Sequence, residues 1–219
     1  MHAALAGIEL VVFDLDGTLV DSAPDLAAAT DAVLAELGAP AAGVTKVRDW
    51  VGNGTRKLVE RALVDARLDP ARTEAVHDRF QALYAAAPCV ESRLFDGVQV
   101  CMAALAERGM PMALVTNKPA AFLHAILGGL GIEGYFRWTL GGDSLPQKKP
   151  DPAPLLHCAE QAGVPPEHCL MVGDSRHDVQ AGRAAGFPVV AVTYGYNHGD
   201  PIRDSNPDYA LDSLAELVA

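Results

Sequence analysis

The sequence predicts an α/β protein with a doubly wound, mostly parallel sheet and an all-helical cap domain inserted after the first strand. One observation is that short runs that are apolar throughout recur along the chain, and helical patterns separate most of them. Strands that are apolar on both faces and joined by helices are typical of parallel sheets covered on both sides. The other observation is that residues 21–90 contain helical patterns only, which predicts the insertion.

The expected strands and helices alternate in the order of a Rossmann-like sheet. The strands are expected at 10–14, 112–117, 137–142, 170–174 and 189–195, of which 137–142 is the weakest apolar run. The helices are expected at 98–108, 119–130, 152–162 and 178–185. Gly109 and Gly186 end two of them, because glycine readily adopts the left-handed conformation that closes a helix.

Four helices are expected in the inserted segment, at 24–37, 45–52, 55–66 and 70–86. Ser22 is a candidate N-cap of the first helix, with Asp25 three residues on, and Asp69-Pro70 can begin the last. The chain is therefore divided into a first core strand, a helical cap domain and the rest of the core, with residues 1–20, 21–90 and 91–219. The two crossings, near 20–22 and 88–94, are hinge candidates.

The composition excludes some classes of partner. The chain has 219 residues, 50% of them hydrophobic, and a net charge of −11, whereas nucleic acids and anionic membranes attract basic surfaces. The apolar run near the N-terminus lacks a basic segment before it and meets Asp14 too early for a membrane span. The four cysteines lie far apart, so we expect reduced thiols and a cytoplasmic location. The sequence carries no signal for an oligomeric state.

Polar side chains follow three of the expected strands. They are Asp14 and Asp16, Thr116 and Asn117, and Asp174 followed by Asp178. Lys148 and Lys149 precede Pro150 in the loop before a helix. Taken singly, each motif also fits an ordinary turn or helix cap. Ligands of open α/β sheets bind beyond the carboxyl ends of the strands, so the shared position favours one crevice.

Two carboxylates one residue apart require a positive partner. Asp14 and Asp16 lie on the same side of an extended backbone, about 6.5–7 Å apart. They would repel each other, and Asp174 nearby would add to the repulsion. A hard divalent cation such as Mg²⁺ offsets this charge with oxygen ligands. The separation also suits one carboxylate that attacks and another that moves a proton.

These motifs resemble those of the haloacid dehalogenase superfamily of phosphohydrolases over the whole chain. The matching stretches are D-x-D-G-T at 14–18, T-N at 116–117, K-P at 149–150 and G-D-S-x-x-D at 173–178. Within the superfamily, the chain closely resembles the bacterial phosphatases of 2-phosphoglycolate. Its stretches WVGNGTRKLVERAL and TYGYNHGDPI contribute to that likeness, although no role for Tyr194–Asn197 follows from the residues themselves.

The resemblance implies a role for each motif residue. Asp14 would be the nucleophile that forms an aspartyl-phosphate, and Asp16 would be the general acid and then the general base. Mg²⁺ would be held by Asp14, the backbone carbonyl of Asp16, and Asp174. The phosphoryl group would be contacted by Thr116, the amide of Asn117 and Lys149. Asp178 would orient the lysine or the metal's waters. Gly17 would let the backbone pass close to the phosphate.

A contact loop for the substrate is expected in the cap, at residues 50–57. Gly52 and Gly54 can present backbone N–H groups at a helix start, where an anion is stabilised. Arg56 or Lys57 could add charge for a substrate carboxylate, and Arg56 is the residue we select. The alternative is that both belong to a solvated helix face.

The sequence therefore predicts a Mg²⁺-dependent phosphatase that acts on a small phosphomonoester, with 2-phosphoglycolate as the expected substrate. The alternative is a related capped phosphatase of a small sugar phosphate or of pyrophosphate. A dehalogenase would need neither Asp16 nor Mg²⁺. A mutase would keep its phosphoenzyme from water, and a binding protein would not need the complete motif set.

Overall fold

Strand β1 (Leu10–Phe13) lies inside a six-stranded parallel sheet, and all four of its side chains are buried. The structure is a computed structural model that describes residues 1–219. The strand order is β5-β4-β1-β6-β7-β8. The other strands are β4 (Met112–Val115), β5 (Trp138–Leu140), β6 (Cys169–Gly173), β7 (Val189–Val192) and β8 (Tyr209–Leu211). The predicted parallel sheet is thus confirmed, with β8 as a strand that the apolar pattern does not mark.

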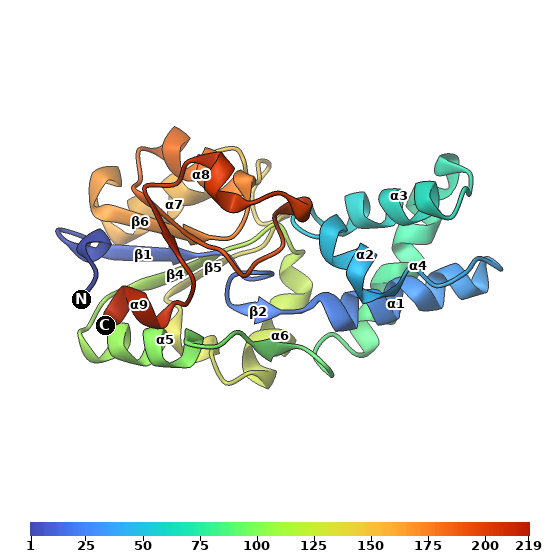
Figure 1. Cartoon of the computed structure of the whole chain (residues 1–219), viewed down its shortest axis with the longest axis horizontal. Helices are drawn as coiled ribbons and strands as arrows, with labels where there is room; N and C mark the ends of the chain where they lie inside the picture. The colour runs from blue at the N-terminus through green and yellow to red at the C-terminus, as the bar shows by residue number, and fades with distance from the viewer.

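Helices cover both faces of the sheet (Figure 1). Alternate side chains of β1 enter two cores: Leu10 and Val12 pack with α7 (Ala153–Ala162) and α8 (Arg176–Ala185). Val11 and Phe13 pack on the opposite side. The helices of that side are α5 (Val98–Glu107), α6 (Leu123–Gly129) and α9 (Ala215–Val218). No helix of the chain has the length and apolar character that crossing a bilayer requires.

Four further helices lie together beyond one end of the sheet, far from both termini (Figure 1). We call them the cap helices: α1 (Ala23–Glu36), α2 (Gly43–Trp50), α3 (Thr55–Asp65) and α4 (Thr73–Ala86). A 3-10 turn at Pro70–Arg72 precedes α4, so the last helix begins later than predicted. The side chain of Asp69 caps that turn by accepting from the N–H of Ala71, which explains the difference.

A two-stranded antiparallel ribbon joins the cap helices to the core. It pairs β2 (Val20–Asp21) with β3 (Arg93–Leu94), close to the predicted hinge segments. Ser22 occupies the N-cap position of α1, as predicted, but its side chain makes no cap bond, because its Oγ donates to Asp16 at 2.5 Å. The boundaries of an independent cap domain at 21 and 90 stay a prediction.

Asp25 ties the two crossings of the ribbon to each other. Its carboxylate accepts hydrogen bonds from the Oγ of Ser92 at 2.6 Å and from the backbone N–H groups of residues 90–92 at 2.8–3.2 Å. Burial alone would raise the pKa of Asp25, but these donors outweigh it and lower the pKa below its ordinary value of 3.8. The charged form of Asp25 therefore stabilises the fold.

Replacing Asp25 by asparagine is expected to lower the free energy of unfolding by about 2 kcal/mol near neutral pH, because an amide N–H₂ then faces backbone donors. The folded-state pKa is lowered, so the wild-type contribution is complete above the unfolded carboxyl pKa and is lost as pH falls through the folded one. Urea titrations at pH 7 and pH 3 check both points. Asp78→Asn, on an exposed face of α4, is the control, and an equal loss in both variants would contradict the role of Asp25.

Candidate active site

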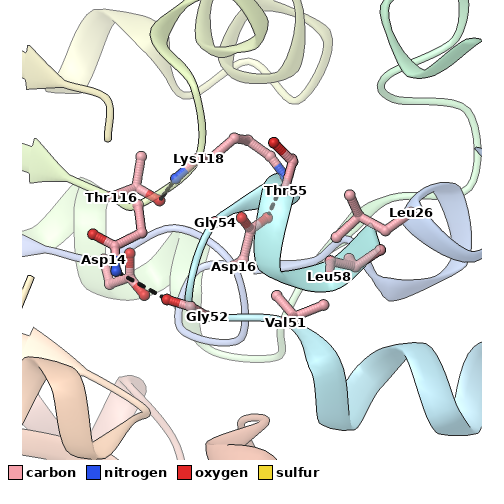
Figure 2. A pocket seen from close by; sticks show the side chains of 11 residues that line it. Asp14, Asp16, Leu26, Val51, Gly52, Gly54, Thr55, Leu58, Thr116 and Lys118 are labelled. Carbon is pink, nitrogen blue, oxygen red and sulfur yellow. Dashed lines mark hydrogen bonds and ion pairs between the residues drawn. The ribbon is translucent and has the colours of Figure 1, made fainter. Parts of the chain in front are cut away.

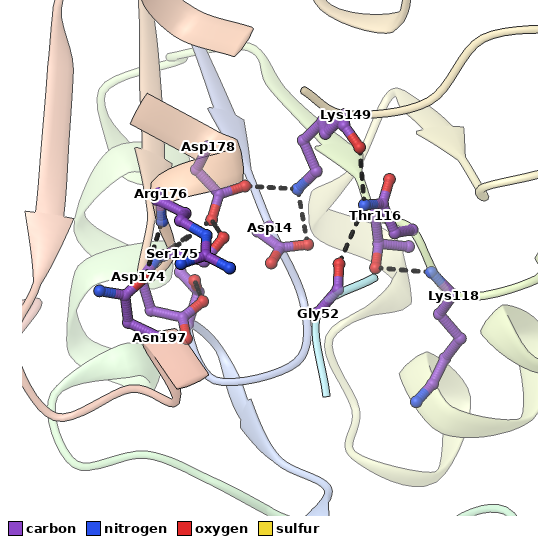
Figure 3. A network of polar contacts seen from close by, with 12 residues as sticks. Asp14, Gly52, Thr116, Lys118, Lys149, Asp174, Ser175, Arg176, Asp178 and Asn197 are labelled. Atoms are coloured by element: carbon purple, nitrogen blue, oxygen red, sulfur yellow. Dashed lines mark hydrogen bonds and ion pairs between the residues drawn. The ribbon is translucent and has the colours of Figure 1, made fainter. Parts of the chain in front are cut away.

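Three neighbouring strands bring the predicted site residues together. In the order β4-β1-β6, the carboxyl ends of these strands lie side by side, and Thr116, Asp14 and Asp174 each follow one of them directly. Lys149 reaches the same place from the loop before α7 (Figure 3). None of the four residues is more than 7% exposed. The site is therefore a buried polar cluster assembled from distant segments.

Lys149 is a cation between two carboxylates. Its Nζ lies 2.7 Å from Oδ1 of Asp178 and 2.8 Å from Oδ1 of Asp14. Asp178 is held in turn, because its Oδ2 accepts from the Oγ and the backbone N–H of Ser175. Burial opposes the charge of Lys149, but the two carboxylates outweigh it and raise the pKa of the ammonium. Lys149 thus stays protonated and is aimed at Asp14.

Asp14 is a buried carboxylate whose charge is poorly compensated. Burial raises the pKa of Asp14 to about 7, against the influence of Lys149, and Asp178 and Asp16 add to the rise. Its Oδ1 forms the ion pair with Lys149 but accepts no aligned hydrogen bond. An under-bonded anionic oxygen of this kind suits both cation binding and nucleophilic attack.

Asp174 is enclosed by the backbone of two glycines. Its carboxylate accepts hydrogen bonds from the Oγ1 of Thr18 at 2.9 Å and from the N–H of Tyr196 at 2.7 Å. A methyl group on Gly17 would lie 2.2 Å from Oδ2, and one on Gly195 would lie 2.1 Å from Cβ. Gly17, which has a φ of +90°, therefore leaves room for Asp174 in this structure.

The segment 194–197 supports the loop after β1, a role that the sequence did not indicate. The hydroxyl of Tyr194 donates to the carbonyl of Thr18 at 2.7 Å, and that of Tyr196 donates to Oδ1 of Asp21 at 2.5 Å. Asn197 accepts from the N–H of Arg176 at 2.8 Å. The Y-G-Y-N pattern is visible in the sequence, but the residues that it contacts are distant in sequence, so its role could not be predicted from it.

The carboxylates of Asp14, Asp174 and Asp178 fit a hard divalent cation. Oxygens from the three lie within 4.8 Å of one another, and all three residues are buried. Burial, Asp178 and Asp14 together raise the pKa of Asp174 well above its ordinary value. Asp178 is paired with the ammonium of Lys149 at 2.7 Å, whereas Asp174 accepts only from the neutral donors of Thr18 and Tyr196, and Asp14 keeps an oxygen without an aligned hydrogen bond. Oxygen donors and uncompensated charge are what Mg²⁺ requires.

Asp16 is not one of the three clustered carboxylates and pairs with a lysine that the sequence analysis did not select. The Nζ of Lys118 donates to Oδ1 of Asp16 at 2.7 Å, and the Oγ of Ser22 donates to the same oxygen. The ammonium also lies 5.1 Å from the ring centroid of Tyr84, in α4. Lys118 directly follows the T-N motif, which was the only sequence signal for it.

Asn117 joins the core to the loop between α2 and α3. Its Nδ2 donates to the carbonyl of Gly52 at 2.9 Å and to that of Lys149 at 3.0 Å. The Oδ1 of Asn117 is buried without a hydrogen bond. The preceding Thr116 uses its Oγ1 to accept from the N–H of Lys118 at 3.2 Å. The loop of the T-N motif is thus ordered by local bonds and by the cap.

A small cavity opens between the sheet end and the cap helices (Figure 2). The core contributes three charged groups to its wall, Asp14, Asp16 and Lys118. The remaining lining residues are Thr116 and Asn117 from the core and Leu26, Val51, Gly52, Gly54, Thr55 and Leu58 from the cap helices and their loop. The glycines at 52 and 54 therefore lie at the cavity, as the contact-loop prediction required.

The structure does not bring Arg56 to this cavity. Its guanidinium pairs with Oε1 of Glu74 at 2.5 Å and approaches Glu60 at 3.9 Å, and 55% of its side chain is exposed. Residue 56 lies one position past the cavity-lining Thr55 on α3, so its side chain emerges on the outer face of the helix. The helix-face alternative describes Arg56 in this structure, and the selection of Arg56 for substrate binding is not supported.

Residues 8–186 match the haloacid dehalogenase-like hydrolase family. The chain is 49% identical to a phosphoglycolate phosphatase of Nitrosococcus oceani over 213 residues, covering 95% of this chain and 94% of the relative. It is 50% identical to one of Pseudomonas putida, covering 95% of this chain and 78% of the relative. A crystal structure of a predicted phosphoglycolate phosphatase from Haemophilus somnus superposes with a TM-score of 0.92 at 38% identity and covers 97% of each chain.

Proposed function

The chain belongs to the haloacid dehalogenase-like hydrolase family, and from this premise we propose that it hydrolyses 2-phosphoglycolate to glycolate and phosphate. Relatives of 49% and 50% identity carry the name of that activity. The observation that supports the chemistry best is the under-bonded carboxylate of Asp14, 2.8 Å from the ammonium of Lys149. A cytoplasmic location and a lack of nucleic-acid partners belong to the same proposal.

In the first step, a carboxylate oxygen of Asp14 attacks phosphorus. The new O–P bond forms as the bond from phosphorus to the glycolate oxygen breaks, and Asp16 donates its proton to that oxygen. In the second step, Asp16 accepts a proton from a water whose oxygen attacks phosphorus. The bond from phosphorus to Asp14 then breaks, which releases phosphate and regenerates both carboxyl groups.

The phosphoryl oxygens need donors that remain in place as charge develops. Lys149 supplies a buried positive charge held by Asp178 at 2.7 Å. Thr116 and the amide of Asn117 supply neutral donors from the loop after β4. Donors that are already oriented require no reorganisation in the transition state, which is why they accelerate such reactions.

We further propose that Mg²⁺ is held by Asp14, Asp174 and the backbone carbonyl of Asp16. When bound, the metal would neutralise phosphoryl charge as the nucleophile approaches. Asp14 and Asp174 fit this role because they are buried carboxylates with raised pKa values. Asp178 orients Lys149 in this arrangement.

Removing divalent metal with EDTA is expected to lower phosphate release to below about 1% of its level, and excess Mg²⁺ should restore it. The melting temperature should also rise with Mg²⁺, by the equivalent of about 2.7 kcal/mol at a hundred times the Kd. Asp174→Asn should lose most of this thermal shift. Full activity in EDTA, or an unchanged shift in the variant, would contradict a metal at this site.

The alternative substrate is a small sugar phosphate or pyrophosphate. The small cavity, with apolar Leu26, Val51 and Leu58 on the cap side, favours a compact ester. Rates of phosphate release from a panel of small phosphate esters separate the two proposals. We expect the highest kcat/KM for 2-phosphoglycolate. A clear preference for a sugar phosphate would contradict that proposal and favour the alternative.

A further inference from the structure

The cavity wall contains one cationic side chain, that of Lys118. The other two charged residues of the wall, Asp14 and Asp16, are acidic. A substrate with a carboxylate beyond its phosphoryl ester would bring a further negative charge next to them. Like charges in a partly buried site repel strongly, so the second anionic group needs a cation or oriented donors.

The cap does not supply that cation in this structure. Lys57, the other candidate from the sequence, places its Nζ 2.8 Å from Glu60, and 53% of its side chain is exposed. Arg56 pairs with Glu74 on the same outer surface. Both charges are already compensated, and neither residue lines the cavity.

Lys118 has the position and the free donors for this role. It is 3% exposed, so solvent screens its charge little. An ammonium has three N–H donors, and one of them is used by Asp16 at 2.7 Å. The ring centroid of Tyr84 lies 5.1 Å away, and the Tyr84 hydroxyl is a second neighbour of the ammonium, which still leaves one N–H for a ligand. Figure 2 shows the side chain of Lys118 extending towards Thr55, at the start of α3.

The order of groups along the reaction path locates the second anion. Asp14 meets phosphorus, and Asp16 meets the oxygen of the leaving group. In 2-phosphoglycolate a single methylene separates that oxygen from the carboxylate. The ammonium of Lys118 is hydrogen-bonded to Asp16 at 2.7 Å and lines the same cavity, so it is the cation next to the group that meets the leaving oxygen.

We propose that Lys118 binds the carboxylate of the substrate and so determines the preference for 2-phosphoglycolate over neutral phosphomonoesters. This inference rests on the proposed function. Lys118 takes the role that the sequence analysis gave to Arg56. Lys118 comes from the core, in the loop that follows β4.

The test compares Lys118→Met with the wild type on 2-phosphoglycolate and on ethyl phosphate, which lacks the carboxylate. The variant is expected to lose about 10- to 100-fold more kcat/KM on 2-phosphoglycolate than on ethyl phosphate, as the loss of one charge-assisted hydrogen bond predicts. Glycolate, used as a product inhibitor, should also inhibit Lys118→Met less strongly than it inhibits the wild type. Lys118→Arg, which keeps the charge, should retain part of the preference.

Lys57→Met is the matched control, since it removes one lysine from the exposed surface of α3; its preference should stay within about twofold of the wild type. An equal loss on both esters in Lys118→Met would show that Lys118 only positions Asp16, and would overturn the inference. The preference of the wild type for 2-phosphoglycolate over ethyl phosphate tests the proposed function. The change of that preference in Lys118→Met tests the role of Lys118. Circular dichroism and thermal melting verify that each variant folds.

Discussion

An Asp14→Asn variant is expected to release phosphate at least about 10⁴ times more slowly than the wild type, the range seen when a catalytic nucleophile is removed. The amide has nearly the shape of the carboxylate but cannot attack phosphorus. Its fold should persist, because the change removes one negative charge from a cluster that also contains Asp174 and Asp178. Lys149 keeps its ion pair with Asp178 at 2.7 Å.

Two measurements separate a lost nucleophile from a damaged site. Acid quenching with labelled substrate should trap phosphate on the wild-type chain and none on Asp14→Asn. The melting temperature in EDTA should be equal to or above that of the wild type. A variant that retains more than about a hundredth of the wild-type rate with a trapped label would exclude Asp14 as the nucleophile.

A Lys149→Met variant is expected to lose both activity and stability. Lys149 is 3% exposed and lies between Asp14 and Asp178 at 2.8 and 2.7 Å, so its removal leaves buried carboxylates without their cation. Breaking a buried pair in this way costs about 3–5 kcal/mol of unfolding free energy. The loss of one oriented phosphoryl contact lowers kcat by about 10²–10³-fold. Urea titration in EDTA and steady-state kinetics measure the two effects.

The adjacent lysine is the matched control for this experiment. Lys148 is exposed and its Nζ donates to the carbonyl of Asn53 at 3.2 Å. Lys148→Met should change the unfolding free energy by less than about 1 kcal/mol. A larger loss in Lys148→Met than in Lys149→Met would show that the site uses the other lysine. The sequence left this choice to the resemblance, because two adjacent lysines look alike.

The β/α alternation was readable from the sequence because each strand carries its own signal. Apolar runs such as 10–14 and 170–174 are local patterns, and a buried parallel strand needs nothing beyond them. The position of Asp14 after one run and Asp174 after another then places both at one edge of the sheet. Strand β8 and helix α9 escaped prediction because they are short and only partly apolar.

Side-chain partners depended on the tertiary structure. Ser22 and Asp25 formed a plausible helix-start pattern, yet they bond to Asp16 and to residues 90–92, which the chain brings near only on folding. Arg56 turned outward to a glutamate, and Lys118 turned inward to Asp16. The sequence thus determined the architecture and the acidic centre, since periodicity and motif order are local properties. Only the tertiary structure decided which cation lines the cavity, because that depends on the competition among all nearby charges.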